Sequence, residues 1–277
     1  MKRPWILPVP EYYARMNGYI VKVGLPYSQE DVKDWASEEQ TLRAVMGDAA
    51  GRSALDCSCG WGKQAIALAK LGWCATATDV SDSSMDFARR CAGDEKVDIA
   101  FRACDMRDLG RHFQGAFDWA VSCFALYELQ TDEEIRQALY GVYAALKPSG
   151  QFYVRLRDMD FLMEELPRHV FKGEKRVENG RIICIEDWDY ESDTHVVALE
   201  AFLREDETRD PGDHFRWTTE TIGVRKRVLR KAELERLLRL VGFEAVTFLP
   251  QPAPWVPFEV VASKPKQCSA ATLQVGY

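Results

Sequence analysis

The sequence contains three aspartates, Asp56, Asp79 and Asp105, whose spacing could bring their carboxylates together at one binding site. Each follows a short apolar run that is typical of a buried strand, and strands that alternate with helices form a parallel sheet. Ligands of such sheets bind outside the carboxyl ends of the strands, so the three carboxylates are expected to face one ligand. Carboxylates accept hydrogen bonds from ammonium groups, hydroxyls and amines, and the ligand is expected to carry such donors.

A glycine-bearing turn follows Asp56 and holds Ser58, Gly60 and Gly62 before a helix that begins near Lys63. The two glycines have no Cβ and let the backbone approach a ligand, while the helix points its free N–H groups at the turn. A dinucleotide fingerprint requires G-x-G-x-x-G, but Ser58 and Lys63 stand at its first and third glycines. A Walker loop is also absent. An acid beside this turn favours a ligand that carries an ammonium group.

The composition indicates a soluble globular protein of 277 residues, with 47% hydrophobic and 29% charged residues. A formal net charge of -7 argues against a nucleic-acid partner, which needs a basic face. No apolar run approaches the roughly 20 residues of a membrane span, and prolines interrupt the basic N-terminus before a signal-peptide core could form. We therefore expect a cytoplasmic protein without a membrane partner.

The 8 cysteines form no C-x-x-C pair and lie mostly in apolar stretches, so they are expected to be reduced and buried, with no metal site.

Strands and helices alternate regularly from Ser53 to Leu156, and this predicts a Rossmann-like, doubly wound α/β fold with helices on both faces of the sheet. A closing strand pair gives a mostly parallel, seven-stranded sheet. Thr131 and Glu134 form a capping-box pattern at the start of one helix. The expected strands are 53–57, 74–78, 97–103, 117–122, 151–156, 243–249 and 259–263, and the expected helices are 63–71, 81–91, 131–146 and 231–241.

A second region departs from this alternation. Asn179-Gly180 is a strong hairpin signal, and the alternating residues around it predict a small antiparallel sheet. Ser28 begins an N-cap signature that predicts one helix to about Met46. The tyrosines before it either pack a helical layer on a sheet or cap the mouth of the ligand site. The expected organisation is an N-terminal helical cap at 1–50, a ligand-binding domain at 51–160 and 226–265, an inserted β region over the substrate at 161–225, and a tail at 266–277.

The run from Asp56 to Gly62 resembles the first motif of the class I S-adenosylmethionine (SAM)-dependent methyltransferases, D-x-[GA]-x-G-x-G, with Ser58 at the small-residue position. Leu146-Lys147-Pro148-Ser149-Gly150 is similar to their L-K-P-G-G turn, and the segment 229–243 is similar to their last helix. The resemblance covers 50–160 strongly and 228–263 moderately. It implies SAM as cofactor, S-adenosylhomocysteine as product and no metal.

The resemblance also implies a role for each matching residue. The methionine end of SAM would lie on Asp56, Ser58, Gly60 and Gly62. The ribose would bind Asp79 with its neighbour Val80, and the adenine would bind Asp105 and Met106. Further cofactor contacts are expected from Ser122 and Phe124, which follow the fourth strand.

Tyr127 and Arg157 are the expected catalytic residues. The stretch Arg157-Asp158-Met159-Asp160 resembles part of the D-H-R-N-Y-D-x-I-L run of the glycine and sarcosine N-methyltransferases, in which the Arg binds the substrate carboxylate. A salt bridge of Arg157 with Asp158 or Asp160 is the structural alternative. Glu186, Trp188 and Tyr190 alternate along one strand face and either cover the acceptor or pack on the domain.

These observations predict methyl transfer from SAM to a small metabolite, at the nitrogen of an amine or N-heterocycle, carboxylate-bearing if Arg157 binds it. An O- or S-methyltransferase is the nearest alternative. A SAM-consuming cyclase, an aminocarboxypropyl transferase and a non-catalytic SAM-binding module also stay open. The sequence leaves the oligomeric state open, a homodimer included.

Overall fold

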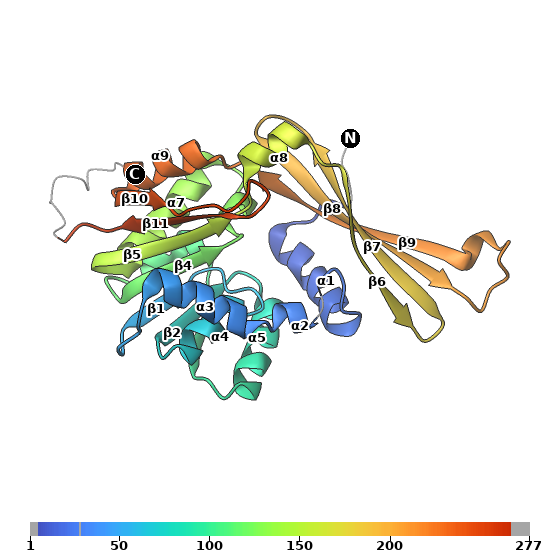
Figure 1. Cartoon of the computed structure of the whole chain (residues 1–277), viewed down its shortest axis with the longest axis horizontal. Helices are drawn as coiled ribbons and strands as arrows, with labels where there is room; N and C mark the ends of the chain where they lie inside the picture. The colour runs from blue at the N-terminus through green and yellow to red at the C-terminus, as the bar shows by residue number, and fades with distance from the viewer. Residues whose placement is uncertain (1–4, 28, 267–277) are drawn as a thin grey trace. The chain divides into compact units, whose positions relative to one another are not determined.

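The structure is a computed structural model that describes residues 5–27 and 29–266, and it divides into two compact units (Figure 1). Unit 1 holds the described residues up to Asp34 together with Leu162–Val228, and unit 2 holds Trp35–Phe161 and the described residues from Leu229 on. The expected cap at 1–50 is therefore divided between the two units. The expected tail at 266–277 lies almost entirely outside the described residues, as does the predicted cap residue Ser28.

Unit 2 is built on a seven-stranded sheet whose strand order is β10-β11-β5-β4-β1-β2-β3. Strands β1 to β5 run parallel to one another, whereas β11 runs antiparallel to both of its neighbours, β5 and β10. The expected doubly wound, mostly parallel sheet is confirmed. Its strands are β1 Ser53–Asp56, β2 Cys74–Asp79, β3 Ile99–Ala103, β4 Phe117–Cys123, β5 Leu146–Leu156, β10 Glu244–Phe248 and β11 Phe258–Ser263.

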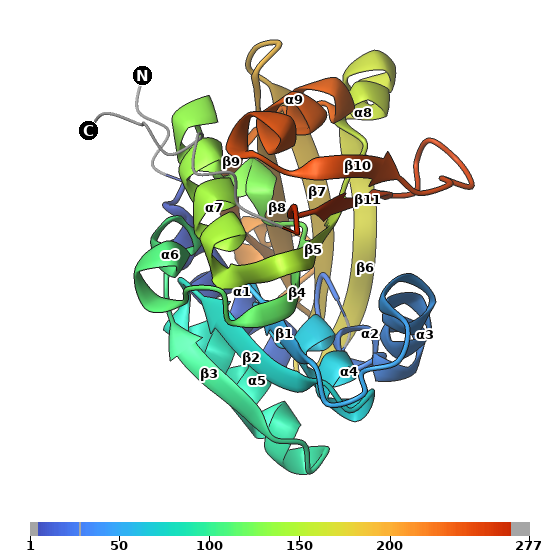
Figure 2. The ribbon, with the colours of Figure 1, turned by 90° about the vertical axis from the view of Figure 1, so that its left-hand side faces the viewer.

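Apolar residues hold the centre of this sheet because parallel strands are covered on both faces. Ala54 and Leu55 in β1, and Ala120 and Val121 in β4, are all fully buried. The helices α3, α4 and α5 pack in sequence along one side, and α6, α7 and α9 along the other (Figure 2). The helical elements are α3 Trp35–Met46, α4 Lys63–Lys70, α5 Asp82–Asp94, η1 Met106–Asp108, α6 Leu109–His112, η2 Leu126–Glu128, α7 Asp132–Ala145 and α9 Lys231–Val241.

The single helix expected from 28 to 46 is wrong, because the chain forms the short α2, Gln29–Val32, and then α3. Asp34 closes a turn between them with a hydrogen bond from its N–H to the carbonyl of Asp31. Val32 is the buried apolar residue of α2, whereas α3 buries Trp35, Leu42 and Met46 along one stripe. An apolar stripe of this kind is what stabilises a helix by packing, and it begins only at Trp35.

Unit 1 is a four-stranded antiparallel sheet of order β6-β7-β8-β9 with α1, Val9–Lys22, packed on it. The hairpin predicted at Asn179-Gly180 is present between β6 and β7. The apolar face of α1 presents Tyr12, Met16 and Ile20 at helical spacing, and the first two join a core with Cys184. The strands are β6 His169–Val177, β7 Gly180–Tyr190, β8 His195–Asp206 and β9 Trp217–Arg227, α8 spans Met159–Glu165 and η3 spans His214–Arg216.

The tyrosines of α1 pack against this sheet. Tyr19 stacks on Phe202 with ring centroids 3.6 Å apart and donates a hydrogen bond to Glu220. On β7, Trp188 is buried and its indole Nε1 donates a hydrogen bond to Glu186 Oε1 at 2.9 Å. These contacts support the packing interpretation of both groups of side chains, and a role over the acceptor stays a prediction.

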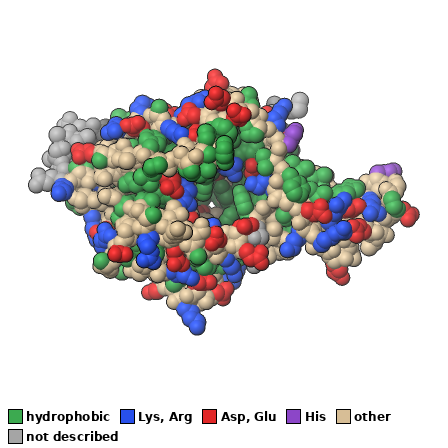
Figure 3. All heavy atoms as spheres, in the orientation of Figure 1, with side chains coloured by type: hydrophobic (Ala, Val, Ile, Leu, Met, Phe, Trp, Pro, Cys, Tyr) green, Lys and Arg blue, Asp and Glu red, His purple; other side chains and the backbone are tan. Residues whose placement is uncertain are grey.

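Lys and Arg side chains are interspersed with Asp and Glu over the face drawn in Figure 3. Within residues 5–27 and 29–266, no helix combines the length and the apolar character that a membrane span requires.

We expect Thr131→Ala to lower the free energy of unfolding by about 1 kcal/mol, because Thr131 Oγ1 accepts the Glu134 N–H at 3.1 Å in the capping box of α7. Chemical denaturation followed by circular dichroism measures it. Thr41→Ala is the matched control, since Thr41 Oγ1 bonds back to the Ser37 carbonyl inside α3 and caps nothing. Equal effects of the two changes would contradict the prediction.

Candidate cofactor-binding site

The site lies at the edge of the unit 2 sheet formed by the carboxyl ends of the parallel strands, which we call the carboxyl edge. Strand β1 pairs with β2 on one side and with β4 on the other. The chain runs from β1 outward to β2 and β3, and then returns to place β4 and β5 on the other side of β1. This is the topological switch point, where open α/β sheets bind their ligands. Asp56 is the last residue of β1 and stands at this point.

Asp56 is a buried carboxyl with an incomplete set of hydrogen bonds. Its Oδ1 accepts the Ser58 N–H at 3.3 Å. Its Oδ2 is buried and accepts no hydrogen bond from any described residue. Burial raises the pKa of Asp56 to about 8, although the nearby backbone N–H groups of Ser58 and Ala65 oppose the shift. A bound ammonium group would supply the missing donor and the missing positive charge, so this carboxyl fits the methionine end of SAM.

The turn after Asp56 is held by side chains from neighbouring strands. Ser58 Oγ lies 3.2 Å from Ser122 Oγ of β4. The Gly60 N–H donates to Asp79 Oδ2 at 2.8 Å, and the Gly60 φ of +47° lies in the left-handed region that favours glycine. A Cβ built on Gly60 would meet nothing within 4 Å, so space is left beside this part of the turn.

Gly62 has a structural reason to be glycine that the sequence did not reveal. Its φ is +89°, and a Cβ there would lie 2.8 Å from the Cβ of Ala88 in α5. Gly62 therefore allows the start of α4 to pack closely on α5. Its expected contact with the cofactor stays a prediction.

Asp79 ends β2 beside Asp56 and organises the same turn. Besides Gly60, it accepts the Ser81 N–H on Oδ1 at 2.8 Å. Burial raises the pKa of Asp79, although the hydrogen bonds from the backbone of Ser81 and Gly60 oppose the shift. Both oxygens thus already accept backbone donors, and a ribose would use their remaining acceptor positions. The next residue, Val80, is exposed, as a wall of a cofactor site would be.

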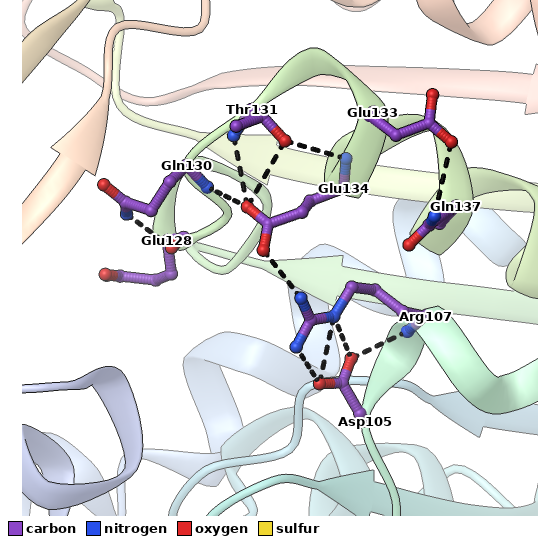
Figure 4. Close-up of polar contacts among 8 residues, drawn as sticks. All are labelled: Asp105, Arg107, Glu128, Gln130, Thr131, Glu133, Glu134 and Gln137. Carbon is purple, nitrogen blue, oxygen red and sulfur yellow. Dashed lines mark hydrogen bonds and ion pairs between the residues drawn. The ribbon is translucent and has the colours of Figure 1, made fainter.

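Asp105 follows β3 and is the N-cap residue of η1. Its carboxylate forms an ion pair with the guanidinium of Arg107 (Figure 4). Met106 is buried next to it, and its carbonyl oxygen would lie 2.6 Å from a Cβ on Gly141 of α7. The missing side chain of Gly141 therefore fixes how closely the segment after β3 approaches α7. The adenine contacts expected of Asp105 and Met106 stay predictions.

The end of β4 and the segment after it are largely buried. Ser122 and Leu126 are fully buried, and Tyr127 is only 3% exposed. Phe124 is half-buried with a positive φ of +60°, and its N–H donates to the Arg155 carbonyl at 2.8 Å. A catalytic contact by Tyr127 and cofactor contacts by Ser122 and Phe124 stay predictions, and the burial of Ser122 gives its hydroxyl a role in holding the turn.

Arg157 follows β5 at the carboxyl edge and is half-buried. The two acids weighed as its partners have other cations nearby. Lys231 Nζ lies 2.6 Å from Asp158 Oδ2, and Arg230 Nη1 lies 3.0 Å from Asp160 Oδ1. These contacts tie the start of α9 to the end of β5.

Two ion-pair networks could not be predicted from the sequence. Arg155, 12% exposed, donates to Glu38 of α3 at 2.9 Å and to Glu259 of β11 at 3.0 Å, and Tyr153 also bonds to Glu259. The second network joins Arg107 to Asp105 and to Glu134 of α7. The alternation in Tyr153–Arg155–Arg157 shows that the side chains share a strand face, but it does not indicate a partner more than a hundred residues away.

No group of three or more His, Cys, Asp and Glu side chains is arranged to hold a metal ion within the described part of the chain.

Known proteins match both the sequence and the fold. Residues 54–150 match the family model described as a methyltransferase domain. A methyltransferase of Geobacillus sp. strain WCH70 is 31% identical over 117 residues, which are 42% of this chain and 47% of that protein. The ubiquinone biosynthesis O-methyltransferase of Coxiella burnetii is 30% identical over 111 residues, 40% of this chain and 46% of that protein. The chain thus spans about half the length of these relatives.

A solved structure, the sugar N-methyltransferase KedS8 of Streptoalloteichus sp., superposes with a TM-score of 0.67 at 15% identity, over 84% of this chain and 89% of that one. The fold is that of the class I SAM-dependent methyltransferases. The region of this chain that matches the methyltransferase domain, 54–150, contains the turn after Asp56 and the ends of β1, β2, β3 and β4.

We expect Asp56→Asn to stabilise the ligand-free protein at pH 8 by on the order of 2–5 kcal/mol, because an unfolded Asp ionises near pH 4 whereas the buried carboxyl has a pKa of about 8. A raised acid pKa means that the folded state holds a proton that the unfolded state releases. The wild type should therefore lose stability as the pH rises from about 4 to about 8. The gain from Asn should shrink toward pH 4, and chemical denaturation at several pH values measures it.

The same carboxyl should make cofactor binding depend on pH. An ammonium group binds the ionised form, so the affinity for S-adenosylhomocysteine should rise several-fold from pH 6 to pH 8 in the wild type and not in Asp56→Asn. For the stability measurement, a gain in the free energy of unfolding from Asp56→Asn that is constant from pH 4 to pH 8 would contradict the raised pKa of Asp56.

We expect Gly62→Ala to cost about 2 kcal/mol or more of stability, because it adds a 2.8 Å contact with Ala88 to the strain of a left-handed alanine. Gly60→Ala is the matched comparison and should cost only about 1 kcal/mol, from strain alone. Adding Ala88→Gly should restore part of the loss in Gly62→Ala and none in Gly60→Ala. Thermal unfolding compares the four proteins, and no rescue by Ala88→Gly would contradict the packing argument.

Proposed function

We propose that this protein is a SAM-dependent methyltransferase that methylates a small metabolite at nitrogen. The observation that carries the proposal is the buried Asp56 carboxyl at the switch point of a class I methyltransferase fold, where one carboxyl oxygen has no hydrogen-bond partner in the described part of the chain. The sulfonium of SAM supplies an activated methyl group, whose C–S electron pair returns to sulfur as the acceptor nitrogen forms the new bond. The acceptor must be an uncharged amine or ring nitrogen when it attacks, and a protonated product releases its proton to water.

Different residues of the carboxyl edge would bind different parts of SAM. Asp56 would hold the ammonium of the methionine end, the turn at Gly60 would lie along it, and Asp79 would accept the ribose hydroxyls. The chain contributes alignment of donor and acceptor, which accounts for a large part of the acceleration when two reactants are held in place. No dedicated base is required for an amine that binds unprotonated.

Arg157 is our candidate for binding the acceptor. A guanidinium fork suits a carboxylate, and Arg157 extends from the end of β5 at the carboxyl edge. The acceptor that fits this arrangement is an amine with a carboxylate.

Nitrogen is favoured over oxygen by the solved-structure neighbour, which is titled a sugar N-methyltransferase and is similar over more of this chain than the sequence relatives are. Oxygen is the second candidate, because the relative from Coxiella burnetii is named an O-methyltransferase.

The test is mass spectrometry of reactions with methyl-labelled SAM and a panel of amino acids, small amines, phenols and thiols. We expect S-adenosylhomocysteine and label on a carboxylate-bearing amine, with an activity loss of about a hundredfold in Arg157→Ala, on the scale of a lost charged hydrogen-bond pair. Arg230→Ala is the control, since it removes a neighbouring arginine that pairs with Asp160, and it should keep most of the activity.

Label on a phenol or a thiol, with no effect of Arg157→Ala, would retain methyl transfer and exclude the carboxylate acceptor. Methylthioadenosine without a labelled acceptor would exclude methyl transfer altogether. Binding of SAM without any turnover would indicate a non-catalytic module.

A further inference from the structure

The carboxylate of Asp105 is held by a single arginine two residues away, as Figure 4 shows. Oδ1 accepts the backbone N–H of Arg107 at 2.9 Å and its Nε–H at 3.0 Å, and Oδ2 accepts Nη2 at 2.6 Å. The guanidinium therefore meets both oxygens in a fork, a geometry that fixes direction as well as charge. Asp105 can neither turn nor withdraw without breaking the pair.

The other end of Arg107 is anchored to α7. Its Nη1 donates to Glu134 Oε1 at 2.7 Å, while the second oxygen of Glu134 accepts the N–H groups of Gln130 and Thr131 at 2.8 and 3.2 Å. Glu134 is thus fixed by the capping box, and it fixes Arg107 in turn. An arginine restrained at both ends has already lost the rotamer freedom that would otherwise oppose an ordered contact.

The pair leaves Asp105 able to accept one more donor. A carboxylate offers about four acceptor positions, and Arg107 brings three N–H donors to them. These are its backbone N–H, its Nη2 and an Nε–H that is shared between Oδ1 at 3.0 Å and Oδ2 at 3.1 Å. The side chain of Asp105 keeps 22% of its surface exposed. Partial burial would raise the pKa of Asp105, but the hydrogen bonds from Arg107 outweigh it and hold that pKa below its ordinary value. The carboxylate therefore stays ionised and presents only acceptors.

We propose that Arg107 is a positioning residue that holds Asp105 in place to accept the 6-amino group of the cofactor's adenine, and that the pair selects a 6-amino purine over a 6-oxo purine. This inference rests on the proposed use of SAM. An amino group donates to the fixed carboxylate, whereas a 6-oxo group places a second acceptor against an oxygen that cannot turn away. A carboxylate that is free to turn would prefer hydrogen-bond donors in general. Because the guanidinium of Arg107 fixes Asp105, the carboxylate should distinguish an adenosyl ligand from an inosyl ligand.

A purely structural role is the competing explanation, in which Arg107 only ties η1 to α7. That role predicts equal losses of affinity for every cofactor nucleoside, because the whole cofactor edge would move together. A positioning role predicts a loss confined to ligands that carry the 6-amino group. The ratio of two affinities therefore separates the explanations.

The experiment measures binding of S-adenosyl-L-homocysteine and S-inosyl-L-homocysteine by isothermal titration calorimetry, in the wild type and in Arg107→Gln. We expect the wild type to prefer the adenosyl ligand by at least tenfold. In Arg107→Gln, the adenosyl affinity should fall about tenfold and the inosyl affinity should change less than twofold. Arg107→Lys should lie between the two, since it keeps the charge and loses the fork.

Arg111→Gln is the matched control, since Arg111 lies four residues further on, is highly exposed and pairs with Asp108. It should leave both affinities unchanged. Asp105→Asn keeps the result decisive if Arg107→Gln does not fold, because an amide can donate to a 6-oxo group and should raise the relative affinity for the inosyl ligand.

Equal losses for both ligands in Arg107→Gln, or no loss, would overturn the proposal, as would an unchanged affinity ratio in Asp105→Asn. A wild type that binds the adenosyl ligand without preference over the inosyl ligand would overturn the selectivity alone and leave the proposed function standing. A wild type that binds neither ligand would overturn both.

Discussion

Burial of the Asp56 carboxyl is the constraint on which the carboxyl edge depends. A carboxyl inside a parallel sheet is costly when ionised, and it is retained only where a partner supplies charge and hydrogen bonds. The backbone of Ser58 supplies a hydrogen bond to one oxygen, whereas the other oxygen has no donor among the residues that the structure describes. The neighbouring Asp79 then fixes the turn through Gly60 and Ser81. In the function proposed above, the ammonium group of SAM would bring the positive charge to this turn.

Features that depend on neighbouring residues could be predicted from the sequence. The alternation of strands and helices, the hairpin at Asn179-Gly180 and the capping box of Thr131 and Glu134 all have local causes, namely periodicity, a turn dipeptide and a cap three residues from its partner. The position of Asp56 at the end of a buried strand follows from the same periodicity. These features specify where a ligand can bind and which charge it must carry there.

Features that depend on packing between distant segments could not be predicted. Arg155 meets Glu38 across 117 positions, and nothing in either neighbourhood indicates the other. Gly62 is required because α5 brings Ala88 against it, although its motif suggests a ligand contact. The sequence pattern indicates a role for Asp105 but none for Arg107. It assigns Glu134, the second partner of Arg107, only to the capping box of α7. In each case the role of the side chain is set by an element that lies far away in the sequence.

The composition of the two units from separate segments has a consequence for the order in which they can form. Helix α1 belongs to unit 1, but the four strands on which it packs begin only at His169. During synthesis, the chain of unit 2 from Trp35 to Phe161 emerges in between, and unit 2 itself waits for α9, β10 and β11. Domains generally fold as units, and closing long loops delays long-range contacts. The apolar stripe of Tyr12 and Met16 must therefore stay unburied, or find a temporary partner such as a chaperone, until most of the protein has been made.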